Sequence, residues 1–210
     1  MKSASTIERR ITELAEPVVT ALGLVIWGVE ILHASRQILR LYVDVIPKEN
    51  SEGSSPETAW ETSPGASIDQ CEEISRHLSL SLDVNDCIDG PYTLEVSTPG
   101  LSRIFFNLKQ MSRYVGDMIE VKLNNSALTE SAGKGIMPQR SHWRGILEAV
   151  DDTGFILAPA GFSVDGDVIP EACPPFRLSW TDVKKTNRVH IFKRPAKPGK
   201  KPKRNTMANA

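Results

Sequence analysis

The 210-residue sequence predicts an α+β protein, in which a domain of two helices and a three-stranded sheet precedes a small SH3-like (Sm-like) β-barrel. Three observations lead to this fold class. Two segments with helical apolar spacing alternate with three segments in which every second residue is apolar. Beyond residue 106, short apolar strands follow one another closely. The end of the chain has neither period. We therefore expect domains at 1–106 and 107–192, and a disordered basic tail at 193–210.

The first helix is expected over residues 5–22. Ser5 and Glu8 have capping-box spacing. Pro17 should kink the helix because it lacks a backbone N–H donor, unless the segment consists of two separate helices. Gly23 is a plausible C-terminal stop. One face of this helix carries its apolar residues, which are Ile7, Ile11, Leu14, Val18 and Leu22.

Two strands should follow as an antiparallel hairpin, Leu24–Leu32 and Ile38–Ile46, because the link between them is short and polar. Alternation places the apolar residues of the first strand on one face: Val25, Trp27, Val29 and Ile31. In the second strand Leu39, Leu41, Val43 and Val45 share a face, and Arg40, Tyr42 and Asp44 point the other way.

Residues 47–66 are rich in Ser, Pro and Glu and are expected to form a flexible insertion. A second helix should begin at the Ser67–Gln70 capping box and run to about Leu82. Its apolar stripe is Ile68, Cys71, Ile74 and Leu78, which makes Cys71 a core thiol. The order helix, strand, strand, helix, strand predicts two helices on one face of a three-stranded sheet.

The C-terminal half predicts a short helical link at residues 107–114 and then a small closed barrel. Residues 151–154 have the composition of a hairpin turn. The long loops 124–141 and 159–175 should project from the barrel. The five expected strands are Met118–Leu123, Trp143–Val150, Phe155–Ala158, Phe176–Trp180 and Arg188–Phe192.

The stretch Tyr92–Ile104 combines a half-buried strand with a constrained turn. Leu94 and Val96 alternate with polar residues, and Pro99-Gly100 fits a type II turn in which glycine takes a positive φ. Its polar side chains are Glu95, Ser97, Thr98 and Arg103. A rigid loop on a strand commonly presents a binding surface, and an ordinary strand terminator fits the same residues.

This stretch resembles the signature of the RimP family of ribosome maturation factors, which reads roughly Tyr-Thr-Leu-Glu-Val-Ser-Ser-Pro-Gly-Leu-Asp-Arg-Pro-Leu. The sequence departs from that pattern at Thr98, Ser102 and Ile104. The resemblance spans about residues 6–192 and is also strong at 16–19 and 82–84. It implies an α+β domain followed by an SH3-like barrel.

The resemblance also implies a function, which is non-enzymatic assembly of the small (30S) ribosomal subunit. The odd number of cysteines and the lack of an apolar signal segment lead us to expect a cytoplasmic protein. Members of the family bind free 30S subunits, and their barrel contacts a small-subunit ribosomal protein near the decoding region, close to 16S rRNA. We expect a monomer whose contact loop consists of Ser97, Thr98, Pro99, Gly100, Leu101 and Arg103. Arg103 would meet a phosphate or a carboxylate of the partner, or else pair internally with Glu95.

Charge is distributed unevenly along the chain. Residues 1–192 hold 18 basic and 26 acidic residues, a net charge of -8, which suits a basic protein partner. The tail has no acidic residue, and its cations suit RNA phosphates, although a solvated solubility tail is the alternative. These cations are Lys193, Arg194, Lys197, Lys200, Lys201, Lys203 and Arg204.

No residue pattern predicts catalysis, a metal site or a cofactor. The four histidines are scattered, and the three cysteines form no close pair. The N-terminus has no apolar signal segment, and no window is long enough to cross a membrane. Two other functions are considered: an Sm-like general RNA-binding regulator that forms rings and binds naked RNA tightly, and a hydrolase that would need an activated Ser102 or Cys87.

Overall fold

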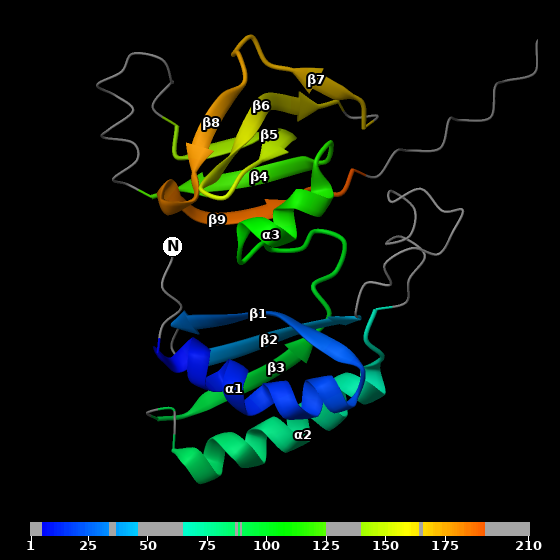
Figure 1. The fold of residues 1–210 in the computed structure, drawn as a ribbon, viewed down its shortest axis with the longest axis vertical. Helices are drawn as coiled ribbons and strands as arrows, with labels where there is room; N and C mark the ends of the chain where they lie inside the picture. Colours follow the sequence, from blue (N-terminus) through cyan, green and yellow to red (C-terminus); the bar gives the residue numbers. More distant parts are fainter. Residues whose placement is uncertain are drawn as a thin grey trace, which may run out of the picture.

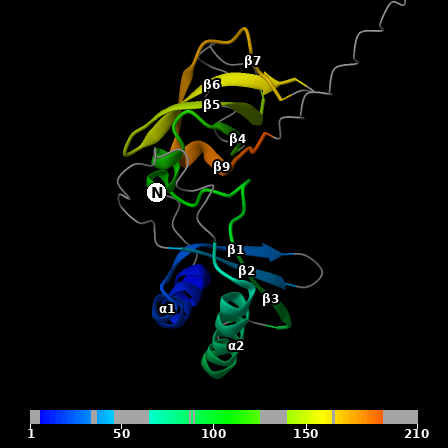
Figure 2. The same ribbon diagram turned by 90° about the vertical axis from the view of Figure 1, so that its right-hand side faces the viewer.

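The computed structural model describes residues 6–33, 37–45, 65–86, 88, 90–124, 140–163 and 166–191. We call α1 to β3 the N-terminal part and α3 to β9 the C-terminal part. In the N-terminal part both helices lie on one face of a three-stranded sheet, and the C-terminal part lies against the other face (Figures 1 and 2). The predicted layer of two helices on one sheet face is thus confirmed.

Helix α1 (Thr6–Ala21) is a single helix that contains Pro17. Gly23, with a φ of 71°, follows its end as expected. Helix α2 (Ile68–Asn85) begins with the predicted capping box of Ser67 and Gln70, but it runs three residues beyond Leu82. The two helices bury Ile11, Ala15, Val19, Ile74, Leu78 and Leu82 against the sheet. Ile68 is exposed, so its assignment to the apolar stripe was wrong.

The N-terminal sheet has the order β1-β2-β3, in which β1 (Leu24–His33) and β2 (Gln37–Val45) form the predicted antiparallel hairpin. Strand β3 (Tyr92–Ser97) pairs with β2 in parallel. The apolar face of β2 packs on the helices as predicted, through Leu39, Leu41, Val43 and Val45.

The predicted face of β1 is wrong at Trp27. A register shift between Ile26 and Gly28 changes the phase of the strand, so that Trp27 faces the C-terminal part while Val29 packs toward the helices. A bulge reverses the alternation of side chains, and nothing in the spacing of apolar residues announces it.

The C-terminal part consists mainly of a six-stranded antiparallel sheet. Its strands follow the order β7-β6-β5-β4-β9, and β8 pairs with β6. In chain order the elements are α3 (Leu108–Met111), η1 (Ser112–Tyr114), β4 (Met118–Leu123), β5 (His142–Val150), β6 (Gly154–Phe162), β7 (Val168–Pro170), β8 (Phe176–Ser179), η2 (Trp180–Asp182) and β9 (Val183–Arg188).

Two expectations for this part need correction. The closed barrel is not found, because β8 and β9 do not pair in the described residues. Among the described residues the last strand is Val183–Arg188, and residues 189–191, which were expected to belong to a strand, form none. The strand was missed because only two of its positions are buried, Val183 and Thr186, so it shows no regular alternation. Strand β7 was also missed, because its three residues are all exposed and lie inside the expected 159–175 loop.

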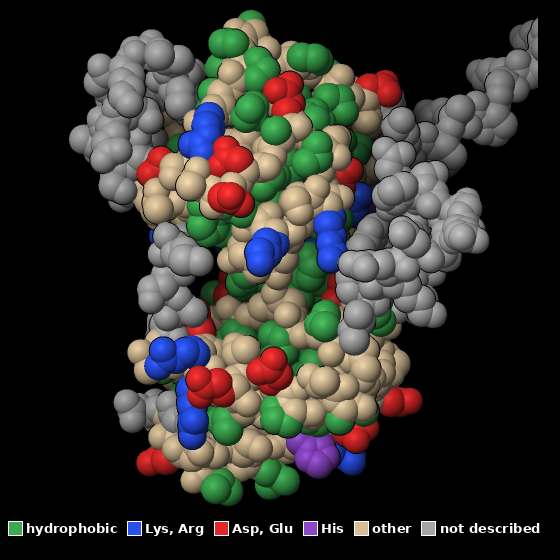
Figure 3. Space-filling view, viewed as in Figure 1, with side chains coloured by type: hydrophobic (Ala, Val, Ile, Leu, Met, Phe, Trp, Pro, Cys, Tyr) green, Lys and Arg blue, Asp and Glu red, His purple; other side chains and the backbone are tan. Residues whose placement is uncertain are grey.

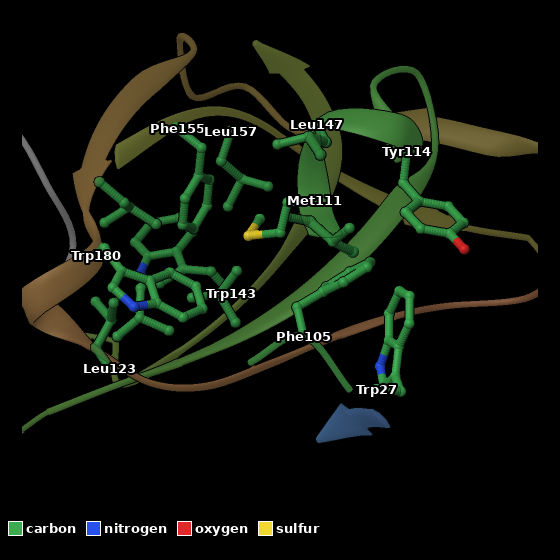
Figure 4. Packing of buried hydrophobic residues seen from close by; sticks show 14 residues of the cluster. Trp27, Phe105, Met111, Tyr114, Leu123, Trp143, Leu147, Phe155, Leu157 and Trp180 are labelled. Atoms are coloured by element: carbon green, nitrogen blue, oxygen red, sulfur yellow. The ribbon is translucent and has the colours of Figure 1, made fainter. Parts of the chain in front are cut away.

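The core of the C-terminal part surrounds Trp143, Phe155, Leu147 and Leu157 (Figure 4). Trp27 enters this core from β1, beside Phe105 and Tyr114. One residue of the N-terminal sheet is therefore buried in the core of the C-terminal part. Among the described residues, no helix is apolar and long enough to cross a bilayer.

Candidate functional site

The signature stretch lies where the two parts meet. Strand β3 ends at Ser97, and the chain turns through Gly100, whose φ of 67° confirms the predicted positive value. Leu101 and Ser102 follow as exposed residues. This geometry presents the loop 97–102 at the surface while both of its ends are fixed.

Arg103 points inward. Only 12% of its side chain is exposed, and its Nη1 donates to Asp44 Oδ2 at 3.0 Å and to Tyr114 Oη at 2.8 Å. Its Nε donates to the carbonyl oxygen of Gly100 at 3.2 Å. One guanidinium thus connects the loop, strand β2 and the C-terminal part.

Two aromatic rings enclose this guanidinium. Its central carbon lies 4.9 Å from the ring centroid of Trp27 and 5.6 Å from that of Tyr114. Burial raises the pKa of Tyr114, although the guanidinium groups of Arg103 and Arg188 act in the opposite direction. The phenol therefore remains a neutral hydrogen-bond acceptor for Arg103 at physiological pH.

We considered an internal ion pair between Arg103 and Glu95, and this partner was wrong. Glu95 accepts a hydrogen bond from Arg40 Nε at 2.5 Å, and these two residues are Cα partners across β3 and β2. This hydrogen bond raises the pKa of Arg40. The partner of Arg103 is Asp44, which is 8% exposed.

Residues 103–105, which follow the loop, form backbone hydrogen bonds with β9 of the C-terminal sheet. Arg188 N donates to the carbonyl oxygen of Arg103 at 2.9 Å, and Phe105 N donates to that of Thr186 at 2.9 Å. Between these bonds Ile104 forms an isolated bridge with Asn187. Residues 103–105 therefore extend the sheet beyond β9, which fixes the direction of the connecting segment.

Trp27 forms hydrogen bonds on the opposite side of the junction between the two parts. Its Nε1 donates to the carbonyl oxygen of Ile104 at 2.7 Å, and its own carbonyl accepts from Gln110 Nε2 at 2.6 Å. The next residue, Gly28, leaves room for this contact, because a Cβ there would lie 2.2 Å from the ring of Phe106 and would force the ring to move. The backbone of β1 and an aromatic ring of the connecting segment thus make direct contact.

A groove of about 590 Å³ opens at this junction. Its lining includes Glu8, Gly28, Glu30, Phe106, Trp180 and Lys185. Lys185 Nζ lies 2.6 Å from Glu30 Oε1, so an ion pair crosses the groove between β9 and β1. The charges of the lining have both signs, which does not favour an anionic or a cationic ligand.

The arrangement fixes the position of the loop 97–102 through the hydrogen bonds of Arg103. In the described part of the chain no three His, Cys, Asp or Glu residues gather as a metal site would require. Ser102 is exposed, and no hydrogen bond joins it to a base within the described residues. Cys87, the other nucleophile considered, lies outside the described residues, and so do the tail cations Lys193 to Arg204.

The structure brings only part of the predicted site to the surface. Ser97, Gly100 and Leu101 are exposed, Thr98 and Pro99 are half-buried, and Arg103 is internal. Sequence reasoning missed Trp27, Asp44 and Tyr114, which hold the loop in place. Asp44 carried no distinct signal, since a polar residue between Val43 and Val45 is what alternation predicts for a half-buried strand.

Comparisons with known proteins identify the family. The RimP N-terminal domain family matches residues 14–102. Ribosome maturation factor RimP of Desulfovibrio desulfuricans is 47% identical over 220 residues, which cover 93% of this chain and 84% of the relative. The proteins of the same name from Nitratidesulfovibrio vulgaris and Lawsonia intracellularis are 38% and 33% identical, over 94% of this chain and 97% and 93% of the relatives. The chain therefore belongs to the RimP family of ribosome maturation factors.

Proposed function

We propose that the chain is a non-enzymatic factor for maturation of the small (30S) ribosomal subunit in the cytoplasm. The relatives are named as ribosome maturation factors, which is not a class of enzyme. The chain would act as a monomer, without a cofactor, by docking a basic ribosomal protein and the 16S rRNA nearby. Such a factor needs different affinities for immature and mature particles, and it needs no reactive groups.

The observation that carries this proposal is the anchored loop 97–102. Arg103 holds it from inside through Gly100 and Asp44, so the backbone of the loop is constrained before any partner arrives. A preorganised loop loses little conformational entropy on binding, which favours affinity. Leu101 is 46% exposed at its tip and provides an apolar contact.

Arg103 has a supporting role in this proposal. A buried guanidinium that is already bound to Asp44 and Tyr114 has little capacity left for an external phosphate. It would instead set the angle between the loop and the C-terminal part, so that one partner can touch both. Contact with the ribosomal partner would come from Ser97 to Ser102.

The charge of the chain supports a basic protein partner. Residues 1–192 have a net charge of -8, and in the face shown in Figure 3 carboxylates lie over α1. The same view also places Lys and Arg side chains over α1 and α3 and carboxylates on the C-terminal part, so charges of both signs are present on each part. Complementary charge of this kind raises the association rate and excludes wrong partners.

Sedimentation of the purified chain with ribosomal particles on sucrose gradients tests the proposal. Wild-type protein should migrate with free 30S subunits and be absent from 50S and 70S fractions. Leu101→Ser should weaken this association by about fivefold, because about 1 kcal/mol of apolar contact is lost. Leu80→Ser is the matched control, since Leu80 is 66% exposed on α2, away from the loop.

Two results would overturn the proposal. Protein that stays at the top of the gradient at low salt does not act on the particle, and this result favours the Sm-like RNA regulator. If the Leu101 and Leu80 variants bind the 30S subunit equally well, the loop is not part of the interface, although the particle remains the partner.

A further inference from the structure

The outward face of the C-terminal sheet carries a row of cationic side chains. Its inward residues, such as Val121 and Trp143, are buried in the core. Cα pairing places the outward residues beside one another across the strands: Glu120 with Arg144 and Lys122 with His142 between β4 and β5, and Lys122 with Lys185 between β4 and β9. Among these paired residues, alternation therefore sets three permanent cations and one histidine on a single face, around the carboxylate of Glu120.

The carboxylate on this face is already engaged. Glu120 Oε1 lies 2.5 Å from His142 Nε2 and 3.6 Å from Arg144 Nη2. Lys185 is bound to Glu30, as described above. Lys122 is exposed and has no ion-pair partner among the described residues, so its ammonium group is available to an external anion.

Arg144 also retains binding capacity. The distance of 3.6 Å between Glu120 Oε1 and Arg144 Nη2 is too long for a hydrogen bond, so the half-exposed guanidinium end of Arg144 can still donate to an external acceptor. Its guanidinium carbon lies 5.1 Å from the centroid of the Phe162 ring. The cation and the ring thus share the same face of the sheet.

Phe162 ends strand β6 and is 43% exposed. Its Cα partner on β7 is Val168, which is exposed as well. A phenylalanine at the surface is ordinary by itself. An exposed ring with an arginine over it, two strands away from an unpaired lysine, has the chemistry of a base-stacking platform beside phosphate contacts.

We propose that this face, defined by Lys122, His142, Arg144 and Phe162, binds single-stranded RNA. Phe162 and the guanidinium of Arg144 stack on a base, and Lys122 contacts a neighbouring phosphate. Duplex RNA fits poorly, because its bases are already stacked and inaccessible to a ring on a flat sheet. The inference deepens the proposed function, since an immature subunit exposes unpaired rRNA, and it rests on that function for its biological setting.

Fluorescence anisotropy of the full-length chain with a fluorescein-labelled 12-nucleotide single-stranded RNA tests the stacking. Phe162→Ala should weaken binding by about tenfold, as expected for the loss of one stacked base. Leu80→Ala removes an exposed apolar side chain from α2 and should leave the affinity unchanged. The tail cannot produce this difference, because residues 193–210 contain no aromatic residue.

A salt titration tests the phosphate contact separately. Lys122→Gln should reduce the slope of log K against log salt by about 0.7, the value for one phosphate contact on a single strand. Lys109→Gln, an exposed lysine of α3, is the matched control and should retain the wild-type slope if α3 does not touch RNA. Lys122 is an exposed residue, so this variant still tests the phosphate contact even if Phe162→Ala fails to fold.

The proposal is overturned if the RNA does not bind, if both variants behave like their controls, or if a duplex of the same sequence binds equally well. Equal binding of a polyglutamate peptide would also contradict it, since charge alone would then explain the attraction. These assays contain no ribosomal particle. A failure here with intact 30S sedimentation would therefore refute the RNA face and leave the proposed function standing.

Discussion

The ion pair of Asp44 and Arg103 should be the most sensitive single interaction of the junction. Their side chains are 8% and 12% exposed and lie 3.0 Å apart. Asp44→Asn preserves the shape of the side chain and keeps an oxygen for the backbone N–H of Val45. It removes the charge, however, and leaves the Arg103 guanidinium buried without its counter-ion.

The expected loss follows from this burial. Removing one member of a buried pair costs about 3 kcal/mol, which lowers the Tm of a chain of this size by about 6–12 °C. Arg103→Met should cost at least as much, because the bonds to Gly100 and Tyr114 are lost together with the pair. The double variant has no uncompensated charge, so it should be more stable than the sum of the two losses predicts, by about 2 kcal/mol.

Urea denaturation followed by tryptophan fluorescence and by far-UV circular dichroism measures these energies. Coincident transitions are needed before a single free energy of unfolding is assigned. The exposed pair of Glu72 and Arg76 on α2 serves as the control cycle, with an expected coupling of about 0.5 kcal/mol or less. Additive effects of Asp44→Asn and Arg103→Met, within about 0.5 kcal/mol, would refute the reasoning.

Three further outcomes are expected. Gly28→Ala should lower the free energy of unfolding by about 1–3 kcal/mol, because its Cβ would meet the Phe106 ring, and Phe106→Leu should restore part of this loss in a urea titration. Hydrogen bonds from Thr153 and Arg177 hold the pKa of Asp151 well below its usual range. The ionised Asp151 carboxylate therefore stabilises the folded protein above the unfolded-state pKa, and this stabilisation is lost as the pH falls through the folded-state pKa. The Tm difference between wild type and Asp151→Asn should hence be present at pH 7 and shrink below about pH 4, and a constant difference would contradict this. Burial raises the pKa of Cys71, so thiol labelling mapped by mass spectrometry should be slow there until urea is added.

The N-terminal layer could be predicted because its signals are local. The capping box of Ser67 and Gln70 and the alternation of Leu39, Leu41 and Val43 depend on residues a few positions apart. The C-terminal part was predicted less well. Strand β9 has only two buried positions, so its period is weak, and β7 has none because it is a three-residue strand at the edge of the sheet.

The candidate site could be located but its geometry could not be derived. Pro99 and Gly100 indicated a constrained turn at the correct place, since backbone preferences are properties of single residues. The direction of Arg103 depends on Asp44, which is 59 positions away, and on which face of the sheet the C-terminal part covers. No spacing along the chain encodes such a pairing.

The sequence by itself therefore determined the helices, the hairpin, the turn after Ser97 and the resemblance to a family. The tertiary structure alone decided that Trp27 crosses to the second core and that Arg103 is an internal clamp rather than an outward contact. The physical reason is that periodicity reports which residues seek burial, whereas a bulge and a long-range ion pair determine what they are buried against.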